Sequence, residues 1–329
     1  MGRPLGLRGR GINNVFATFN LLDDILAPGR VFWCDPANGG DSQDGMSLGS
    51  AVKSLLTAYN MCTAGLNDIV ILVSDGGTTG TARVDAAFTW AKNATHLIGL
   101  CSPTMYSQRA RIANTAATTA FANFFTVSAS GCIFKNIQFY QGFTTGTTSE
   151  ICMTVTGSRN QFKNCSFASM QSTTSAGSAS SRNLKIGLAG SGENLFEDCV
   201  IGTDTFTRST TNASLELSGA TPRNVFRRCH FPTYTSNAGA LGILGTGADC
   251  LDRFNVFESC TFINAIKSGS TQMTVLVSLT NAAPGGMLLF KDCASIGATK
   301  FGDTIALANS YLDMAAVSGS AGGLMVVPS

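Results

Sequence analysis

A short phrase of alternating hydrophobic and polar residues recurs along the second half of the chain. It consists of Phe, two polar residues, Cys or Ile, one further residue, and usually Phe or Ile. Copies start at Phe134, Phe162, Phe196, Phe226, Phe257 and, in a weaker form, Phe290, so successive starts are 28, 34, 30, 31 and 33 residues apart. Strand-like segments precede most copies, and turns rich in Gly, Ser, Thr and Asn separate them. A period of about 30 residues without helical spacing predicts the turns of a β-solenoid.

In each copy, the residues at the first, fourth and sixth positions are predicted to point into the core. The spacing of three between the first two breaks strict alternation, so a bend must fall between them. The third position carries mostly Asn or Asp, which tolerate the left-handed backbone of a tight bend, and Arg228 departs from this pattern. The predicted core column consists of Phe134, Phe162, Cys165, Phe196, Cys199, Phe226, Cys229, Phe257, Cys260, Phe290 and Cys293.

The second position of each copy is predicted to face solvent. It carries Lys135, Lys163, Glu197, Arg227, Glu258 and Lys291, and from Lys163 onward the sign of the charge alternates. Strands of successive turns lie about 4.8 Å apart. Opposite charges on neighbouring turns would therefore contribute roughly 0.2–1 kcal/mol per pair. The sequence thus predicts a ladder of ion pairs along one outer face.

The chain begins with a basic stretch and an amphipathic segment. Residues 12–27 place apolar side chains at helical spacing, and Pro28-Gly29 follows as a stop signal. Residues 1–27 are predicted to serve in attachment or oligomerisation, although a loose terminus and a helix packed on its own domain are alternatives. The segment 28–99 is predicted to be the entry and cap of the solenoid, and 100–329 the solenoid itself. The predicted attachment residues are Arg3, Arg8, Arg10, Phe16 and Phe19.

Residues 30–75 run from a strand, VFWC, through an Asp- and Gly-rich turn and a short helix to the strand DIVILV. This order resembles the entry segment of pectin-lyase-like β-helix proteins. The resemblance implies an all-β fold, a right-handed parallel β-helix whose first turn is closed by a capping helix. Many proteins of this superfamily are bacteriophage tail spikes and other virion appendages, commonly homotrimers. The matching positions are Asp35, Pro36, Gly39, Asp41, Asp44, Gly45, Ala51, Lys53 and Asp68.

Composition narrows the possible partners. The net charge is +2 without a long basic run, which argues against a nucleic-acid partner. No stretch reaches the ~18 consecutive apolar residues of a membrane span, and the first thirty residues lack signal-peptide features, so synthesis in a cytosol is expected. The eleven cysteines are predicted to be free thiols, because no C-x-x-C pair occurs and the only histidines are His96 and His230.

The acidic residues are the candidates for a metal or catalytic site. Asp35, Asn38, Asp41 and Asp44 suggest a calcium loop, but their spacing favours Asx turns. Glycoside hydrolysis needs two carboxylates about 5–10 Å apart, and Glu216 has no partner that the sequence identifies. No catalytic residue, cofactor or metal is therefore predicted. The acidic residues weighed in the coil are Glu193, Glu197, Asp198, Glu216, Asp249, Asp252, Glu258 and Asp292.

The sequence therefore predicts a non-enzymatic bacteriophage structural protein of the virion, assembled in the host cytoplasm. Capsid decoration is the favoured role, with the N-terminal arm attached to the major capsid protein or another virion protein. A homotrimer is expected, with neither nucleic acid nor a membrane as partner. The alternatives are a tail spike or fibre that binds or cleaves host polysaccharide, and an adhesin that binds a host surface glycan without cleaving it.

Overall fold

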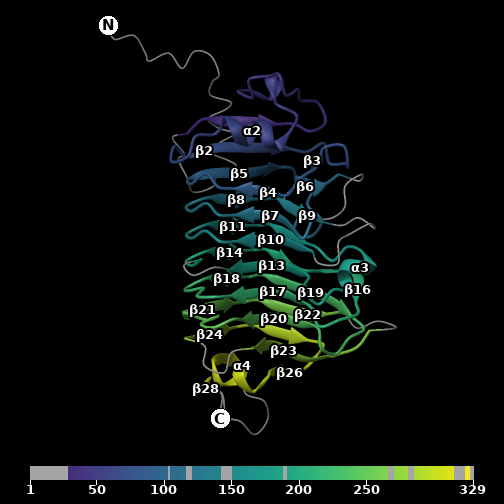
Figure 1. The fold of residues 1–329 in the computed structure, drawn as a ribbon, viewed down its shortest axis with the longest axis vertical. Coiled ribbons are helices and arrows are strands. Elements are labelled where there is room, and N and C mark those ends of the chain that lie inside the picture. Colours follow the sequence, from purple (N-terminus) through teal and green to yellow (C-terminus); the bar gives the residue numbers. More distant parts are fainter. Residues whose placement is uncertain are drawn as a thin grey trace.

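The computed structural model describes residues 29–102, 104–115, 121–141, 150–187, 191–265, 270–280, 285–314 and 323–326. Within these residues the strands stack into three sheets, A, B and C, which the chain visits in turn as it winds along one long axis (Figure 1). This architecture confirms the predicted right-handed parallel β-helix. The predicted attachment residues Arg3, Arg8, Arg10, Phe16 and Phe19 lie outside the described residues.

Sheet A contains the first half of each recurring phrase, and its neighbouring strands are parallel except for the last pair, β27 and β28. Its strands are β1 (Val31–Cys34), β2 (Asp68–Val73), β5 (Thr95–Leu100), β8 (Ile133–Lys135), β11 (Gln161–Lys163), β14 (Leu195–Glu197), β18 (Val225–Arg227), β21 (Arg253–Glu258), β24 (Gly286–Lys291), β27 (Ser310–Met314) and β28 (Gly323–Val326).

Sheet B contains the second half of the phrase, and sheet C closes each turn. Sheet B consists of β3 (Ala82–Val84), β6 (Arg111–Asn114), β9 (Gln138–Tyr140), β12 (Ser166–Ala168), β15 (Val200–Ile201), β16 (Thr203–Arg208), β19 (His230–Thr235), β22 (Thr261–Asn264) and β25 (Ala294–Ile296). Sheet C consists of β4 (Phe88–Trp90), β7 (Asn123–Val127), β10 (Ile151–Val155), β13 (Arg182–Gly187), β17 (Ala213–Ser218), β20 (Leu241–Thr246), β23 (Met273–Leu279) and β26 (Ala298–Gly302). Short helices are η1 (Leu48–Ser50), α2 (Leu55–Met61), α3 (Thr173–Ala176) and α4 (Thr304–Ala308).

The Phe and Cys residues of the phrase form two continuous columns inside the helix. The Phe rings of successive turns are stacked with centroids 4.6–4.9 Å apart and planes within 8° of parallel. Each Cys Sγ donates a hydrogen bond of 3.3–3.4 Å to a Phe carbonyl oxygen of a preceding turn. All eleven cysteines are free thiols. Stacked rings and small thiols thus fill the corner between sheets A and B.

The bend after each sheet A strand has the left-handed backbone expected from its Asn and Asp residues. The third phrase position has φ between 51° and 57° in every copy, and Arg228, at 51°, adopts it as well. Such a conformation costs a non-Gly residue about 1–2 kcal/mol. The Arg228 guanidinium lies 2.7 Å from Asp198 and 3.0 Å from Glu197 of the preceding turn, and these ion pairs offset part of that cost.

A buried asparagine ladder precedes four of the six copies of the phrase, two residues before Phe162, Phe196, Phe226 and Phe257. Asn160, Asn194, Asn224 and Asn255 are almost completely buried. The backbone N–H of each of the first three donates to the side-chain oxygen of the next asparagine at 3.0–3.1 Å. These side chains satisfy amides that lie where sheet C turns into sheet A. In these copies the motif is therefore N-x-F-x-x-C. The phrase defined from the sequence began at the Phe and did not include this asparagine.

Helix α2 closes the first turn of the hydrophobic core. The Ser54 hydroxyl caps the helix by accepting a hydrogen bond from the Thr57 amide. The Tyr59 ring packs 4.6 Å from Trp90 and 5.4 Å from Phe88, and its hydroxyl accepts hydrogen bonds from the amides of Ala91 and Lys92. The helix therefore shields the end of the core from water, as the resemblance implies.

Candidate functional site

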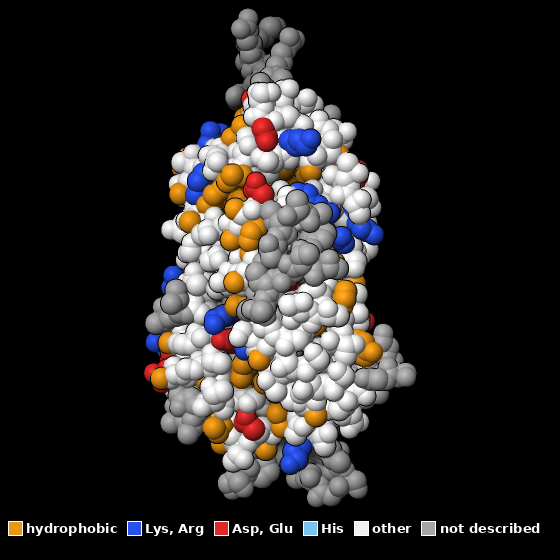
Figure 2. All heavy atoms as spheres, turned by 45° about the vertical axis from the view of Figure 1, so that its right-hand side comes forward, with side chains coloured by type: hydrophobic (Ala, Val, Ile, Leu, Met, Phe, Trp, Pro, Cys, Tyr) orange, Lys and Arg blue, Asp and Glu red, His pale blue; other side chains and the backbone are white. Residues whose placement is uncertain are grey.

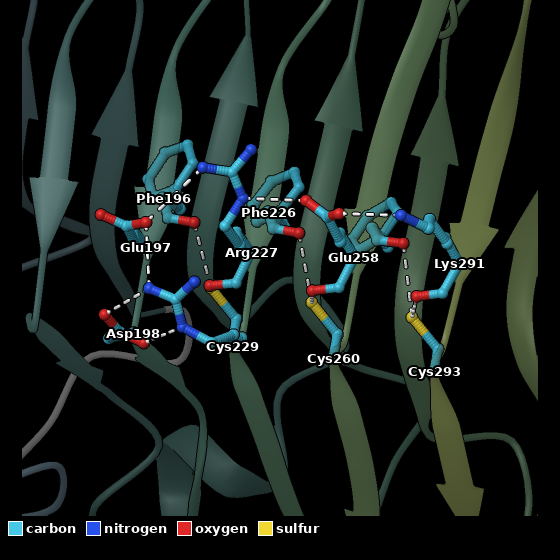
Figure 3. Close-up of polar contacts among 12 residues, drawn as sticks. Phe196, Glu197, Asp198, Phe226, Arg227, Cys229, Glu258, Cys260, Lys291 and Cys293 are labelled. Carbon is cyan, nitrogen blue, oxygen red and sulfur yellow. Dashed lines mark hydrogen bonds and ion pairs between the residues drawn. The ribbon is translucent and has the colours of Figure 1, made fainter.

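The outer face of sheet A carries the charge ladder (Figure 3). Glu197 lies 3.8 Å from Lys163 and 3.6 Å from Arg227, while Glu258 lies 2.8 Å from Arg227 and 3.2 Å from Lys291. A shallow pocket of about 310 Å³ opens beside Arg227 and Glu258. Hydrogen bonds from Arg227 and Lys291 lower the pKa of Glu258, so this carboxylate stays ionised and is unsuited to donate a proton. The ladder is better suited to holding turns together than to acid catalysis.

Replacing Glu258 by Gln is expected to lower the free energy of unfolding by about 1 kcal/mol or less, because exposed ion pairs contribute little. Denaturant unfolding at low and high salt measures the effect, which should shrink as salt screens the ladder. A loss that is several times larger and insensitive to salt would contradict a solvent-exposed ladder.

On the outer face of sheet C, Glu216 has the partners that the sequence did not reveal. Its carboxylate lies 2.7 Å from Arg182 and 2.9 Å from Lys185, and it accepts a 2.8 Å hydrogen bond from Thr246. Burial raises the pKa of Glu216, but these partners outweigh it and hold the pKa below its ordinary value. The β13–β17 register, which pairs Lys185 with Glu216, creates this cluster.

The other acidic residues weighed in the sequence are also bound or placed in turns. Glu193 binds Arg159 at 2.7 Å and contacts Arg223, and Asp198 binds Arg228. Asp249 and Asp292 occupy left-handed turn positions, and Asp252 lines a surface pocket with Arg253. Within the described residues, these acids provide no pair of carboxylates poised for hydrolysis.

The Asp-rich entry turn is organised by backbone hydrogen bonds. One Asp35 oxygen accepts from the amides of Ala37 and Asn38, and one Asp41 oxygen accepts from the amides of Lys53 and Ser54. Among the described residues, no group of three or more His, Cys, Asp or Glu side chains could hold a metal ion. None of the helices in the described ranges is long and apolar enough to cross a membrane.

The outer face of sheet B carries a cluster of arginines beside a tyrosine, here called the basic face (Arg83, Arg109, Arg111 and Tyr140). Arg111 donates a 2.6 Å hydrogen bond to Gln138, and its guanidinium lies 5.0 Å from the centre of the Tyr140 ring. Arg83 lies one strand away on β3, and Arg109 lies two residues before the start of β6. Figure 2 shows Lys and Arg side chains gathered on the upper part of the molecule, toward its right edge.

Two arginines of the basic face differ from the ion-paired residues of sheet A. Among the ion pairs of the described residues, none involves Arg109 or Arg111. Burial lowers the pKa of Arg111, and repulsion from Arg109 and Arg83 lowers it further. Burial raises the pKa of Tyr140, so its phenol stays protonated near neutral pH. Unbalanced guanidinium groups beside an aromatic ring suit a ligand that carries carboxylates.

The same outer face continues along the helix to a histidine. His230 begins β19, and its ring centroid lies 6.1 Å from that of Tyr106, which lies in the segment between β5 and β6. Burial lowers the pKa of His230, so its imidazole is neutral at pH 7. From β6 to β19 the sheet spans four strand spacings, roughly 19 Å. The outward residues between these strands, Gln138, Ser166 and Val200, are buried, so the exposed charge of this face is concentrated at the end that carries Arg83 and Arg109.

Comparison with solved structures identifies the fold. A pectin methylesterase in complex with a hexasaccharide aligns with 84% of this chain and 82% of its own, at 15% identity and a TM-score of 0.52. Pectate lyase Pel9A aligns with 86% and 80%, at 12% identity and a TM-score of 0.53. A rhamnogalacturonan lyase aligns with 80% and 73%, at 13% identity and a TM-score of 0.51. No protein-family model and no curated protein matches the sequence.

These neighbours overturn one prediction. The sequence predicted a protein without enzymatic activity, whereas the solved structures that it resembles are polysaccharide-processing enzymes. That prediction arose because the carboxylates visible in the sequence belong to ion pairs or turns, and because no basic residue stands out in the sequence beside a set of carboxylates. The arginine and tyrosine side chains of sheet B were not considered. The chain has the pectin-lyase-like parallel β-helix fold.

Proposed function

We propose that this chain binds and processes an acidic polysaccharide along the basic face of sheet B. The observation that carries the proposal is that Arg111 packs on the Tyr140 ring with Arg109 near it, and that neither arginine has a carboxylate partner among the described residues. A guanidinium group binds a carboxylate through two parallel hydrogen bonds, and an aromatic ring packs on the apolar side of a sugar. The pectin- and rhamnogalacturonan-processing neighbours support a polysaccharide as the ligand.

The chemistry of the basic face favours elimination over hydrolysis. Hydrolysis of a glycosidic bond uses two carboxylates, whereas this face offers guanidinium groups and a protonated phenol. Arg111 would neutralise the carboxylate of a uronic acid, which acidifies the proton on C5. Water would take that proton as the bond between C4 and the glycosidic oxygen breaks, and the Tyr140 hydroxyl would protonate the departing oxygen. Lyases are among the structural neighbours, which supports this choice.

The virion setting is part of the same proposal. A β-helix that binds or cleaves host polysaccharide corresponds to the tail spike or fibre that the sequence offers as its alternative. Attachment through residues 1–27, capsid decoration and homotrimer formation remain predictions. Quantifying the chain in purified virus particles tests the setting, since a handful of copies per particle is expected for a tail spike and hundreds for a decoration protein.

Replacing Arg111 by Gln is expected to weaken binding of polygalacturonate at least about tenfold, because a charge-assisted hydrogen bond is lost. Titration calorimetry at low salt measures the affinity, with neutral dextran as the comparison ligand. The matched control is Lys300→Gln, which removes one exposed positive charge from β26 on sheet C. Equal binding of dextran and polygalacturonate, or unchanged affinity in the Arg111 variant, would contradict the proposed surface.

Processing is tested separately from binding. Incubation with polygalacturonate and with its methyl ester should produce unsaturated uronate, seen as a rise in ultraviolet absorbance, if the chain eliminates. Methanol release would instead indicate an esterase. Binding without either product would support the binding surface but contradict the proposal that the chain processes the polysaccharide.

A further inference from the structure

A stripe of apolar side chains lies beside the charge ladder on the outer face of sheet A. Leu195, Val225, Val256 and Leu289 occupy one outward position on successive strands, paired in register from β14 to β24. Phe254 and Met287 lie two residues earlier on the same side, 38% and 37% exposed. We call these six residues the apolar stripe. The residues that alternate with them, such as Phe257 and Leu288, point into the core.

The helices of the described residues pack elsewhere on the molecule. Helix α2 contacts β1, β2 and β3, α3 contacts β16, and α4 contacts β23 and β26. The apolar stripe is bordered on one side by Glu197, Arg227, Glu258 and Lys291. An apolar centre with a charged border is the pattern of a protein–protein interface.

The order of charges along the ladder indicates which partner would fit. Along the helix axis the ladder reads negative, positive, negative, positive from Glu197 to Lys291 (Figure 3). Read in the opposite direction, the signs are exchanged at every position. A second copy with its axis reversed would therefore place its Glu258 opposite Arg227 and its Lys291 opposite Glu197. The same arrangement would place Val256 of the second copy against Val225, and Leu289 against Leu195.

A parallel arrangement fits the charges less well. If the two copies were related by a two-fold axis parallel to the helix axis, the ladder of one copy would face the opposite border of the apolar stripe of the other copy. Each residue would then face one from the same turn. That border carries Glu193 and Arg223, which belong to the same turns as Glu197 and Arg227. Like charges would then face one another, which is unfavourable.

We propose that two copies of this chain pair face to face through sheet A, antiparallel, about a two-fold axis between the strands β18 and β21. The apolar stripe forms the centre of this contact, and the ladders exchange ion pairs at its border. The contact lies on a different sheet from the basic face. It gives an even number of copies, whether or not the predicted homotrimer also forms.

Light scattering on the full chain, across a range of concentrations, tests the pairing. The expected result is a dimer or an even multiple, and Val256→Lys should raise its dissociation constant at least about tenfold by placing a charge in the centre of the interface. Val275→Lys makes the same change at a half-exposed position on the outer face of sheet C and should leave assembly unchanged. A thermal melt of each variant by circular dichroism confirms that it is folded. A monomer at all concentrations, or an odd-numbered assembly unaffected by Val256→Lys, would overturn the proposal.

A crosslinking experiment tests the antiparallel geometry. Packed sheets lie about 10 Å apart, so a thiol crosslinker of about that length is used. Chains carrying Leu195→Cys should be crosslinked to chains carrying Leu289→Cys in a mixture, with the unmodified chain as the blank. Chains carrying Leu195→Cys should not be crosslinked to one another, because the two copies of position 195 would be offset by three strand spacings, roughly 14 Å, along the axis. Crosslinking of Leu195→Cys chains among themselves would contradict the reversed arrangement.

Discussion

Replacing Phe226 by Ala is expected to lower the free energy of unfolding by about 3–5 kcal/mol, the usual cost of deleting a buried ring. The side chain is completely buried and lies between Phe196 at 4.9 Å and Phe257 at 4.6 Å, nearly parallel to both. The cavity would therefore interrupt the column between two stacked rings. Denaturation in guanidinium chloride, followed by circular dichroism, measures the loss.

The control for this variant is Tyr106→Ala, which removes an aromatic ring that is 46% exposed. Its effect on unfolding should stay within about 1 kcal/mol, as for most surface substitutions. Similar losses in the two variants would show that the Phe column is not the main support of these turns.

Replacing Glu150 by Gln is expected to stabilise the protein at pH 8 by up to about 3 kcal/mol. Glu150 is fully buried, and neither of its carboxyl oxygens makes a hydrogen bond of normal geometry among the described residues. Burial raises its pKa to about 7, which the nearby Ser175 hydroxyl and Met170 amide only partly offset. Ionising this group inside the folded protein is therefore costly.

The direction of the pH dependence follows from that shift. Because the folded state holds the proton more tightly than the unfolded state, the contribution of Glu150 to stability is greatest below its unfolded pKa of 4.5. It falls as the pH rises toward about 7 and is level above that. The Gln variant should lose this part of the pH dependence. Denaturant midpoints measured from pH 4 to pH 8 test it, and a wild-type protein whose stability lacks this fall would contradict the raised pKa.

Glu216→Gln provides the opposite control. The pKa of Glu216 is lowered by Lys185 and Arg182, so this carboxylate stabilises the fold above its unfolded pKa. Its replacement should therefore destabilise the protein at pH 8, whereas replacement of Glu150 stabilises it. If both substitutions shift stability in the same direction, the two carboxylates do not differ in environment as described.

The corner between sheets A and B was predictable because its residues repeat in sequence. Stacking in register requires the same side chain at the same height in each turn, so the Phe and Cys columns and the charge ladder appear as a period in the chain. Even Arg228, an exception in residue type, adopts the conformation of its column. The asparagine ladder repeats in the same way, and extending the phrase by two residues toward Asn194 and Asn224 would have found it.

The basic face could not be found by the same argument. Arg83, Arg109 and Arg111 lie before the first copy of the phrase and do not repeat, so only the fold brings Arg83 and Arg111 next to Tyr140. The partners of Glu216 depend on the register of sheet C, whose connecting segments vary in length. The burial of Glu150 depends on residues of its own turn that have no equivalent in the other turns. Periodicity indicates what is shared by all turns, whereas these sites are made by what differs between them.

The columns of the A–B corner have a consequence for how this protein can change in evolution. The coils that carry Phe162, Phe196, Phe226 and Phe257 present the same Phe, Cys and Asn contacts upward and downward. A coil inserted or deleted as a unit among them would find matching neighbours on both sides. The number of coils in the β-helix can therefore change in evolution while the contacts in its interior stay the same. Loops on the outer faces can diversify at the same time, because the interior that supports them stays the same.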